Sequence, residues 1–329
     1  MCVTVPTPRK AKTRCYSVRP TLYLAIKRAR RYMKKHNMPD HMELTDEFIQ
    51  KLHDNIAKKD YDCFTADERL KKGLSLEKIQ LEHCSSWTIR NETNPPDKVI
   101  YYIHGGGFVN GCTKDLFKFI SYAVKHFGYN LYSVDYRLTP DYTCMDTITD
   151  CENGYKYLLE HYSPENIVLM GESAGGNLIL ALPHKLRDDG LPFPAGIIAS
   201  SPVVQFLHYP YSYYECSCKT DFGIIFGIND VTKLYRGDLP LDHPYLSPLC
   251  GDLSGYPPVY LDASDVESLR DEARMMFVRL KEEGCDVEYH ELRDFFHAML
   301  TAPHFRFVRK EEHTHVIAFL NRIFNTARD

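Results

Sequence analysis

The sequence predicts an α/β protein in which helices cover both faces of a mainly parallel central sheet. From about residue 78 onward, short apolar runs alternate with amphipathic stretches of helical periodicity. The apolar runs show little polar alternation and are bounded by turn residues, which is typical of strands buried on both faces. Strands that alternate with helices favour parallel order, because each parallel connection needs a crossover that a helix can supply.

Six segments have the character of buried strands, and helical segments lie between most of them. In chain order the expected strands are KVIYYIHG, NLYSVDY, NIVLMG, AGIIASSPV, PPVYLDAS and DVEYHEL. The expected helices cover residues 114–127, 144–161, 173–187, 269–283 and 311–325. In such sheets ligands bind beyond the carboxyl ends of the strands, so functional residues are expected in the loops that follow them.

The first part of the chain has a different character. Residues 20–72 show helical spacing in TLYLAIKRARRYM and TDEFIQKLHDNI, and they contain no strand-like run. The sequence therefore predicts a helical segment over residues 1–75 and an α/β domain over residues 76–329. The basic run 27–35 fits the solvated face of a helix best, and contact with acidic lipid or nucleic acid stays open.

Composition excludes several classes of protein. With 44% hydrophobic and 26% charged residues the chain is typical of a globular protein, and its formal charge of −4 gives no electrostatic reason for a nucleic-acid partner. No apolar run reaches the ~18 residues of a membrane span, and no secretory signal precedes the domain. The 11 cysteines are scattered without zinc spacing, so we expect reduced thiols, a cytoplasmic location, no metal site and no cofactor.

Three consecutive glycines follow the first buried strand, in His104-Gly105-Gly106-Gly107-Phe108. Glycines lose more backbone entropy on folding than other residues, so a run of them suits a sharp turn whose N–H groups point at a ligand. A merely flexible turn fits these letters equally well. A phosphate-binding loop does not, because no Gly-Lys-Ser/Thr follows.

Ser173 lies in Gly171-Glu172-Ser173-Ala174-Gly175, which matches the G-x-S-x-G pattern between an apolar strand and a helix. The flanking glycines allow strand and helix to approach closely around a strained turn that exposes the serine hydroxyl. The hydroxyl is then either a nucleophile or the cap of the following helix, and the local letters do not decide between them.

A serine nucleophile needs a base and an orienting acid from elsewhere in the chain. His297 lies in the loop after the last expected strand, whereas His290 lies within that strand. The loop after PPVYL offers Asp265 and Glu267, between the serine and the histidine in the chain. The order Ser, acid, His is the one that this strand–turn–helix motif predicts.

The motifs HGGGF, DYRLTPD, GESAGGN, SPLCGDLSGYPPVYL, ESLRDEA and FFHAM occur here in order, and together they resemble the hormone-sensitive-lipase-like (HGGG) carboxylesterases of the α/β-hydrolase family. The resemblance implies an α/β-hydrolase fold over about residues 78–329, with an N-terminal helical cap. It implies Ser173 as nucleophile and His297 as general base. It also implies an oxyanion hole formed by the backbone of Gly105, Gly106, Gly107 and Ala174, and loops braced by the Asp and Arg of DYRLTPD.

The acid departs from the family pattern. Many members have Asp-Pro-Leu-Arg-Asp-Glu where this chain has ESLRDE, so Glu267 stands at the acid position and Ser268 replaces the proline. Glutamate can hold the imidazole as aspartate does, and Glu267 is the preferred acid. Asp265, two residues earlier, remains the alternative.

These residues predict a serine carboxylesterase that hydrolyses short-chain acyl esters through an acyl-enzyme. An amidase or deacetylase of an acylated metabolite would use the same groups, and a non-catalytic hydrolase-fold binding protein is a third alternative. The expected partner is a small-molecule ester, with no nucleic acid and no membrane span. Association into a homo-oligomer and the natural substrate stay open.

Overall fold

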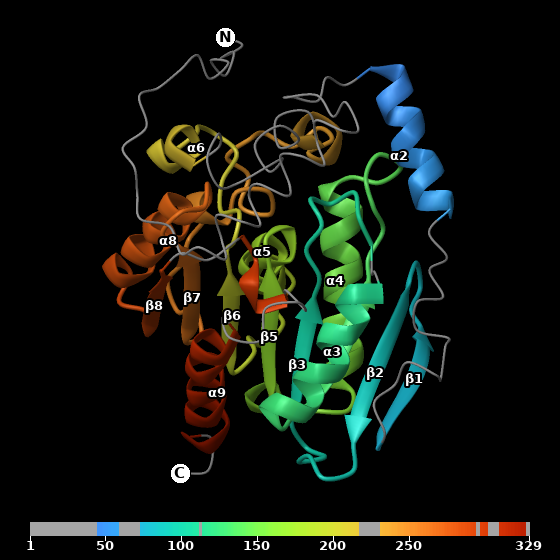
Figure 1. The fold of residues 1–329 in the computed structure, drawn as a ribbon, viewed down its shortest axis with the longest axis vertical. Helices are drawn as coiled ribbons and strands as arrows, with labels where there is room; N and C mark the ends of the chain where they lie inside the picture. The colour runs from blue at the N-terminus through green and yellow to red at the C-terminus, as the bar shows by residue number, and fades with distance from the viewer. Residues whose placement is uncertain are drawn as a thin grey trace.

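The computed structural model describes residues 45–58, 73–111, 114–216, 231–293, 297–301 and 309–326. They form a sheet of 8 strands in the order β1-β2-β4-β3-β5-β6-β7-β8, with helices on both sides (Figure 1). The strands are β1 (Leu74–Gln80), β2 (Ser85–Asn91), β3 (Val99–Ile103), β4 (Asn130–Asp135), β5 (Ile167–Glu172), β6 (Gly196–Ser200), β7 (Val259–Ser264) and β8 (Val287–Leu292).

All the described helices except Tyr211–Cys216, which was not expected, agree with expected segments to within a few residues. The helices are α2 (Asp46–Lys58), α3 (Lys114–Phe127), α4 (Cys144–Leu159), α5 (Ala174–Asp188), α6 (Tyr211–Cys216), α8 (Arg270–Glu282) and α9 (Arg309–Thr326), with 3-10 turns at Pro164–Asn166, Pro248–Cys250 and Met299–Thr301. The six expected strands are β3 to β8, and all of them are parallel. The predicted α/β-hydrolase architecture is thus confirmed.

The sequence reading missed β1 and β2, which lie at one edge of the sheet and pair in antiparallel order. In β1 every position is half-buried or exposed, and Glu77 and Lys78 interrupt the apolar pattern, so the segment lacks the continuous apolar run of the inner strands. The sheet therefore begins at Leu74, just inside the segment expected to be a helical cap. Helix α2 coincides with TDEFIQKLHDNI, while residues 1–44 and 59–72 of that segment lie outside the described residues.

Alternate side chains of each inner strand enter two different cores. In β3, Tyr101 points into the core shared with α4, α5 and α8, whereas Tyr102 points into the core shared with α3 and α9. The two-residue period of a strand has this consequence when both faces are covered. Burial on both faces explains why the inner strands have apolar sequences throughout.

The register of the parallel strands aligns the carboxyl ends of four strands, so the loops that follow these strands lie at the same end of the sheet. Ile103 at the end of β3 pairs with Gly171 of β5, Glu172 pairs with Ser200 at the end of β6, and Ser200 pairs with Asp262 of β7. The glycine loop, Ser173 and the candidate acids therefore follow neighbouring strand ends. Helices α2 and α6 lie toward this end of the sheet (Figure 1). Within the described chain, none of the helices combines the length and apolar character needed to cross a bilayer.

Candidate active site

Ser173 lies on the turn between β5 and α5 with φ 56° and ψ −120°, a conformation that costs free energy in a non-glycine residue. Its backbone is held on both sides, because its N–H donates to Ser200 O and its carbonyl accepts from Asn177 N–H, each at 3.0 Å. Ser173 occupies the N-cap position of α5, but its hydroxyl makes no capping hydrogen bond. Helix capping therefore does not explain the serine, and the residue is partly exposed.

Two glycines make this turn sterically feasible. A Cβ at Gly175 would lie 2.1 Å from Ile103 O, and a Cβ at Gly171 would lie 2.7 Å from the same oxygen. Both clashes involve backbone atoms of β3, which cannot move aside easily. The fixed glycines of the G-x-S-x-G pattern are thus required by the close approach of β3, β5 and α5.

The glycine loop lies directly beside Ser173. A Cβ on Gly105 would be 3.2 Å from Ser173 Cβ, and Gly106, Gly107 and Phe108 have φ values of 121°, 64° and 62°. The Gly105 N–H donates to Glu172 Oε1 at 2.8 Å, so it is not available as an oxyanion donor, contrary to the expectation for this glycine. Among the described residues, no acceptor takes the N–H of Gly106, Gly107 or Ala174.

The DYRLTPD segment anchors both ends of the glycine loop. Tyr136 Oη donates to His104 O at 2.8 Å, and Thr139 N–H donates to Phe108 O at 2.9 Å. Arg137 fixes the segment itself through an ion pair with Asp150, with 2.9 Å between Nε and Oδ2. The contacts to the glycine loop thus come from Tyr136 and Thr139, whereas the arginine that was expected to brace the loops holds the segment against α4.

Glu267 and His297 are in contact. Glu267 Oε2 lies 3.0 Å from His297 Nδ1, and Oε1 of the same carboxylate accepts the Ser264 N–H at 3.2 Å. Glu267 is 1% exposed and His297 15%, so the carboxylate is shielded and the imidazole remains accessible. Asp265 is partly exposed in the same loop, and its backbone carbonyl accepts a hydrogen bond from Arg270 Nη1 at 2.8 Å.

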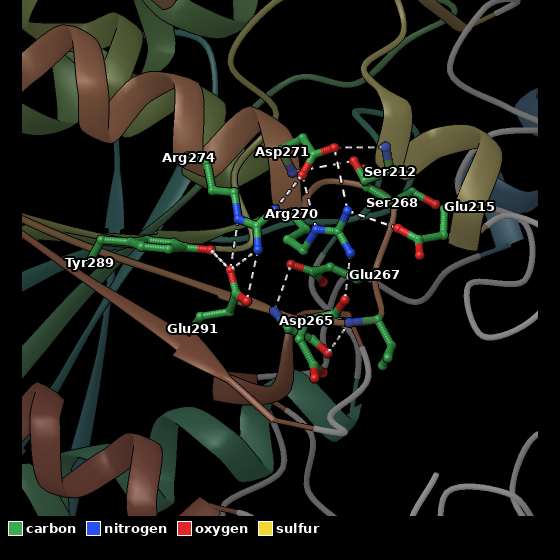
Figure 2. A network of polar contacts seen from close by, with 12 residues as sticks. Ser212, Glu215, Asp265, Glu267, Ser268, Arg270, Asp271, Arg274, Tyr289 and Glu291 are labelled. Atoms are coloured by element: carbon green, nitrogen blue, oxygen red, sulfur yellow. Dashed lines mark hydrogen bonds and ion pairs between the residues drawn. The ribbon is translucent and has the colours of Figure 1, made fainter. Parts of the chain in front are cut away.

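A network of ion pairs stiffens the loop that carries these acids (Figure 2). Arg270 reaches Asp271 and Glu215, each with 2.9 Å between nitrogen and oxygen, as well as the backbone of Asp265. Arg274 lies beside it and pairs with Glu291 of β8. The network ties the end of β7 to α6, α8 and β8, and so limits the movement of the loop that contains Glu267.

Ser201 is a site residue that the sequence reading missed. Its Oγ accepts the N–H of Ala298, the residue after His297, at 3.1 Å. Both residues have positive φ, 46° for Ser201 and 54° for Ala298, so two strained positions hold each other. This contact connects the histidine loop to the end of β6, where Ser200 O accepts the Ser173 N–H. The only sequence signal for Ser201 is its place directly after an expected strand.

Two further carboxyls near the strand ends are buried. Burial raises the pKa of Glu172 from 4.5 to about 7, although its hydrogen bonds and the charge of His297 act in the opposite direction. Burial, together with the negative charge of Glu267, likewise raises the pKa of Asp262 to about 7. His297 is therefore within electrostatic reach of a second carboxyl, that of Glu172, besides the one it contacts.

The described residues include no group of three or more His, Cys, Asp or Glu side chains arranged to hold a metal ion. What the strand ends assemble is a strained serine, a glycine loop with unused N–H groups, and a histidine in contact with a buried carboxylate. Such an arrangement suits nucleophilic attack on a carbonyl group.

Comparison with known proteins agrees with this chemistry. Residues 100–301 match the family model described as alpha/beta hydrolase fold. An acetyl-hydrolase from Streptomyces hygroscopicus is 26% identical over 220 residues, which cover 67% of this chain and 73% of that protein. Lipase 2 from Moraxella sp. is 27% identical over 241 residues, covering 63% of this chain and 54% of the lipase.

A solved structure agrees over a longer range. An esterase from the bacterial hormone-sensitive lipase family superposes with a TM-score of 0.77 at 25% identity, covering 94% of this chain and 100% of that one. The matched family, the related lipase and the esterase with the same architecture together show that the chain belongs to the alpha/beta hydrolase fold family, as a member of its hormone-sensitive-lipase-like group of carboxylic ester hydrolases.

Proposed function

We propose that the protein hydrolyses short-chain acyl esters in two steps through an acyl-enzyme on Ser173. The observation that carries the proposal is the contact of His297 Nδ1 with the buried Glu267 carboxylate, at the same end of the sheet as a serine whose hydroxyl does not cap its helix. A carboxylate can only accept a hydrogen bond, so this contact requires the proton on Nδ1 and leaves Nε2 as a base.

In the first step His297 Nε2 takes the Ser173 proton while the serine oxygen attacks the ester carbonyl. Glu267 holds the imidazole in the required tautomer and stabilises the imidazolium that forms. The N–H groups of Gly106, Gly107 and Ala174 stabilise the oxyanion. The alcohol leaves with the proton from His297, and water then attacks the acyl-enzyme by the same route.

Two observations support a short acyl chain. The first relative described above is named an acetyl-hydrolase, which concerns a two-carbon acyl group in that protein. Phe108, which follows the glycine loop, is 4% exposed, and its ring stacks on Tyr235 at 3.8 Å between centroids. The space beside the loop is thus filled by aromatic side chains, which leaves less room for a long chain.

A cap over the site fits the position of α2. His53 of this helix lies 3.0 Å from Asp141 of the DYRLTPD segment, with the distance measured from Nδ1 to Oδ1. We propose that α2, the described helix of the N-terminal segment, forms part of a cap that covers the substrate and excludes water.

Turnover of p-nitrophenyl esters tests the proposal. We expect the acetate and butyrate to be hydrolysed with higher kcat/KM than the decanoate. Ser173→Ala should lower kcat by roughly 10⁴–10⁶ without changing the far-UV CD spectrum or the melting temperature by more than a few degrees. Hydrolysis of the acetate by Ser173→Ala at the wild-type rate would refute the nucleophile.

An amidase or deacetylase is the second candidate, because an acetyl-hydrolase by name does not specify an ester or an amide. Both activities use the same catalytic groups, and they differ in the leaving group, which is an alcohol for an ester and an amine for an amide. Comparing p-nitrophenyl acetate with p-nitroacetanilide separates them, and a higher kcat/KM for the anilide would favour the amidase.

A further inference from the structure

Glu172 is the residue immediately before Ser173, and its carboxyl group is buried at 5% exposure. Its Oε1 accepts the Gly105 N–H at 2.8 Å, and its Oε2 accepts the Tyr102 hydroxyl at 2.7 Å. A polar group so deeply buried is tolerated only where partners satisfy it. Both partners come from β3 and the loop after it, so Glu172 joins the strand of the serine to the strand of the glycine loop.

The glycine loop is closed at Gly106, whose carbonyl accepts the backbone N–H of Asn110 at 3.0 Å and the Asn110 side-chain amide at 3.1 Å, but these bonds do not hold Gly105. Gly106 and Gly107 lack a Cβ and adopt positive φ, a region from which glycine readily moves into other conformations. Tyr136 holds the loop at His104, and Thr139 holds it at Phe108. Glu172 holds it between these ends, at Gly105, where a Cβ would already lie within 3.2 Å of Ser173 Cβ.

Fixing the Gly105 N–H also orients the peptide groups that follow it. The next two N–H groups along the chain are those of Gly106 and Gly107, to which the proposed mechanism assigns the oxyanion. Donors to an oxyanion act through preorganisation, and a displacement of about 1 Å can lower the rate by about 100-fold.

We propose that Glu172 is a positioning residue that fixes the glycine loop beside Ser173 through the Gly105 N–H and thereby preorganises the oxyanion hole. This inference rests on the proposed function, because it needs Gly106 and Gly107 to act as donors. It concerns the shape of the loop and not the charge of the carboxyl group. Burial raises the pKa of Glu172 to about 7, and a carboxyl group keeps an acceptor oxygen for the Gly105 N–H in either protonation state.

Three substitutions of Glu172 distinguish the effects of side-chain length, charge and acceptor oxygen on kcat. Glu172→Met keeps the length but has no acceptor oxygen, and we expect kcat for p-nitrophenyl acetate to fall by about 100-fold with KM changed by less than about threefold. Glu172→Asp keeps the charge but is one methylene shorter, so kcat should fall similarly. Glu172→Gln keeps a carbonyl oxygen near the position of Oε1 and should restore most of the activity that the other two lose.

Glu272 provides a matched control for the loss of a buried carboxyl group. It is fully buried, and it accepts a tyrosine hydroxyl, that of Tyr213 at 2.6 Å, and a backbone N–H, that of Val204 at 2.7 Å. It does not contact the glycine loop. Glu272→Met should therefore lower the melting temperature as Glu172→Met does, but lower kcat far less.

Hydrogen exchange of the amides of residues 104–108 gives a readout that does not depend on turnover. In the full-length protein exchange should be faster in Glu172→Met and Glu172→Asp than in wild type, and unchanged in Glu172→Gln and Glu272→Met. The proposal is overturned if exchange in Glu172→Met equals that of wild type. It is also overturned if the wild type is active and Glu172→Met raises KM without lowering kcat. If wild type hydrolyses no ester, the proposed function fails, and exchange alone then decides whether Glu172 holds the loop.

Discussion

The buried Glu267 carboxylate contacts His297 across 3.0 Å, and the loop around it is braced by Arg270. The ion pairs in Figure 2 hold this loop against α6 and β8, so Glu267 presents its carboxylate in a fixed direction. An imidazole held in this way keeps one tautomer, which is the state that a general base requires.

The first prediction concerns the choice of acid. Glu267→Gln replaces an acceptor that orients the Nδ1 proton, and we expect kcat for p-nitrophenyl acetate to fall by about 10³–10⁴. Asp265→Asn is the matched control in the same loop and should change kcat by less than about fivefold. The opposite ranking of the two variants would assign the acid to Asp265.

The second prediction concerns Ser201. Ser201→Ala removes the acceptor for the Ala298 N–H, so the loop carrying His297 should become less well fixed and kcat should fall by about tenfold. Ser201→Gly removes the same hydroxyl but relieves the positive φ of 46°.

If the hydroxyl matters, both variants lose kcat to a similar extent, whatever they do to stability. A normal kcat in Ser201→Gly would show that the hydrogen bond to Ala298 has no part in catalysis. Steady-state kinetics together with a thermal melt of each variant distinguishes the two outcomes.

The third prediction concerns Gly175, two residues after the nucleophile. Gly175→Ala places a Cβ 2.1 Å from Ile103 O, and a backbone oxygen in a central strand cannot give way cheaply. We expect the free energy of unfolding to fall by about 3 kcal/mol or more. Gly196→Ala is a milder control, since its Cβ would meet side-chain atoms of Phe319 and Ile323 at 3.3–3.4 Å. Urea denaturation measures both, and equal losses would contradict the steric account of the turn.

The fourth prediction concerns pH and stability. Burial raises the pKa of Glu272 from 4.5 to about 7, so the folded state holds a proton that the unfolded state releases. The stabilisation of the folded protein by this protonated carboxyl group is therefore complete below about pH 4.5, and it is lost as the pH rises through 7. Glu272→Gln mimics the neutral form and does not titrate.

We accordingly expect the wild type to lose about 1–3 kcal/mol of stability relative to Glu272→Gln between pH 5 and pH 8. Chemical denaturation of both proteins at the two pH values measures this difference. Groups shared by the two proteins cancel in the comparison. A difference that does not vary with pH would show that Glu272 has an ordinary pKa.

The inner part of the fold was predictable because its elements have strong patterns of their own. Strands β3 to β7 have largely apolar sequences, which follow from their burial on both faces. Strand β8 lies at the far edge of the sheet, and its four middle residues are half-buried or exposed. Strands β1 and β2 were missed because the pairing that forms them, such as Leu76 with Ile89, is not visible in either segment alone. The predicted domain boundary at residues 75 and 76 accordingly falls inside β1.

Parts of the site were predictable for a different reason. Ser173, His297 and the acids follow strands that end at one edge, so chain order and the rule for parallel sheets bring them together. Hydrogen bonds between loops could not be predicted from the sequence. Serine and glutamate are common residue types, so nothing in the letters marked Ser201 or Glu172 as a partner of these loops. The engagement of the Gly105 N–H by Glu172 could not be foreseen from three adjacent glycines.

Covalent labelling of Ser173 tests the central claim most directly. A fluorophosphonate probe followed by peptide mass spectrometry should find one adduct per chain, located on Ser173, in wild-type protein. Ser173→Ala should show no adduct, and Glu267→Gln should react far more slowly, because the imidazole would no longer be held as a base. An adduct on another residue, or a folded wild-type protein that hydrolyses p-nitrophenyl acetate without being labelled at Ser173, would contradict the account.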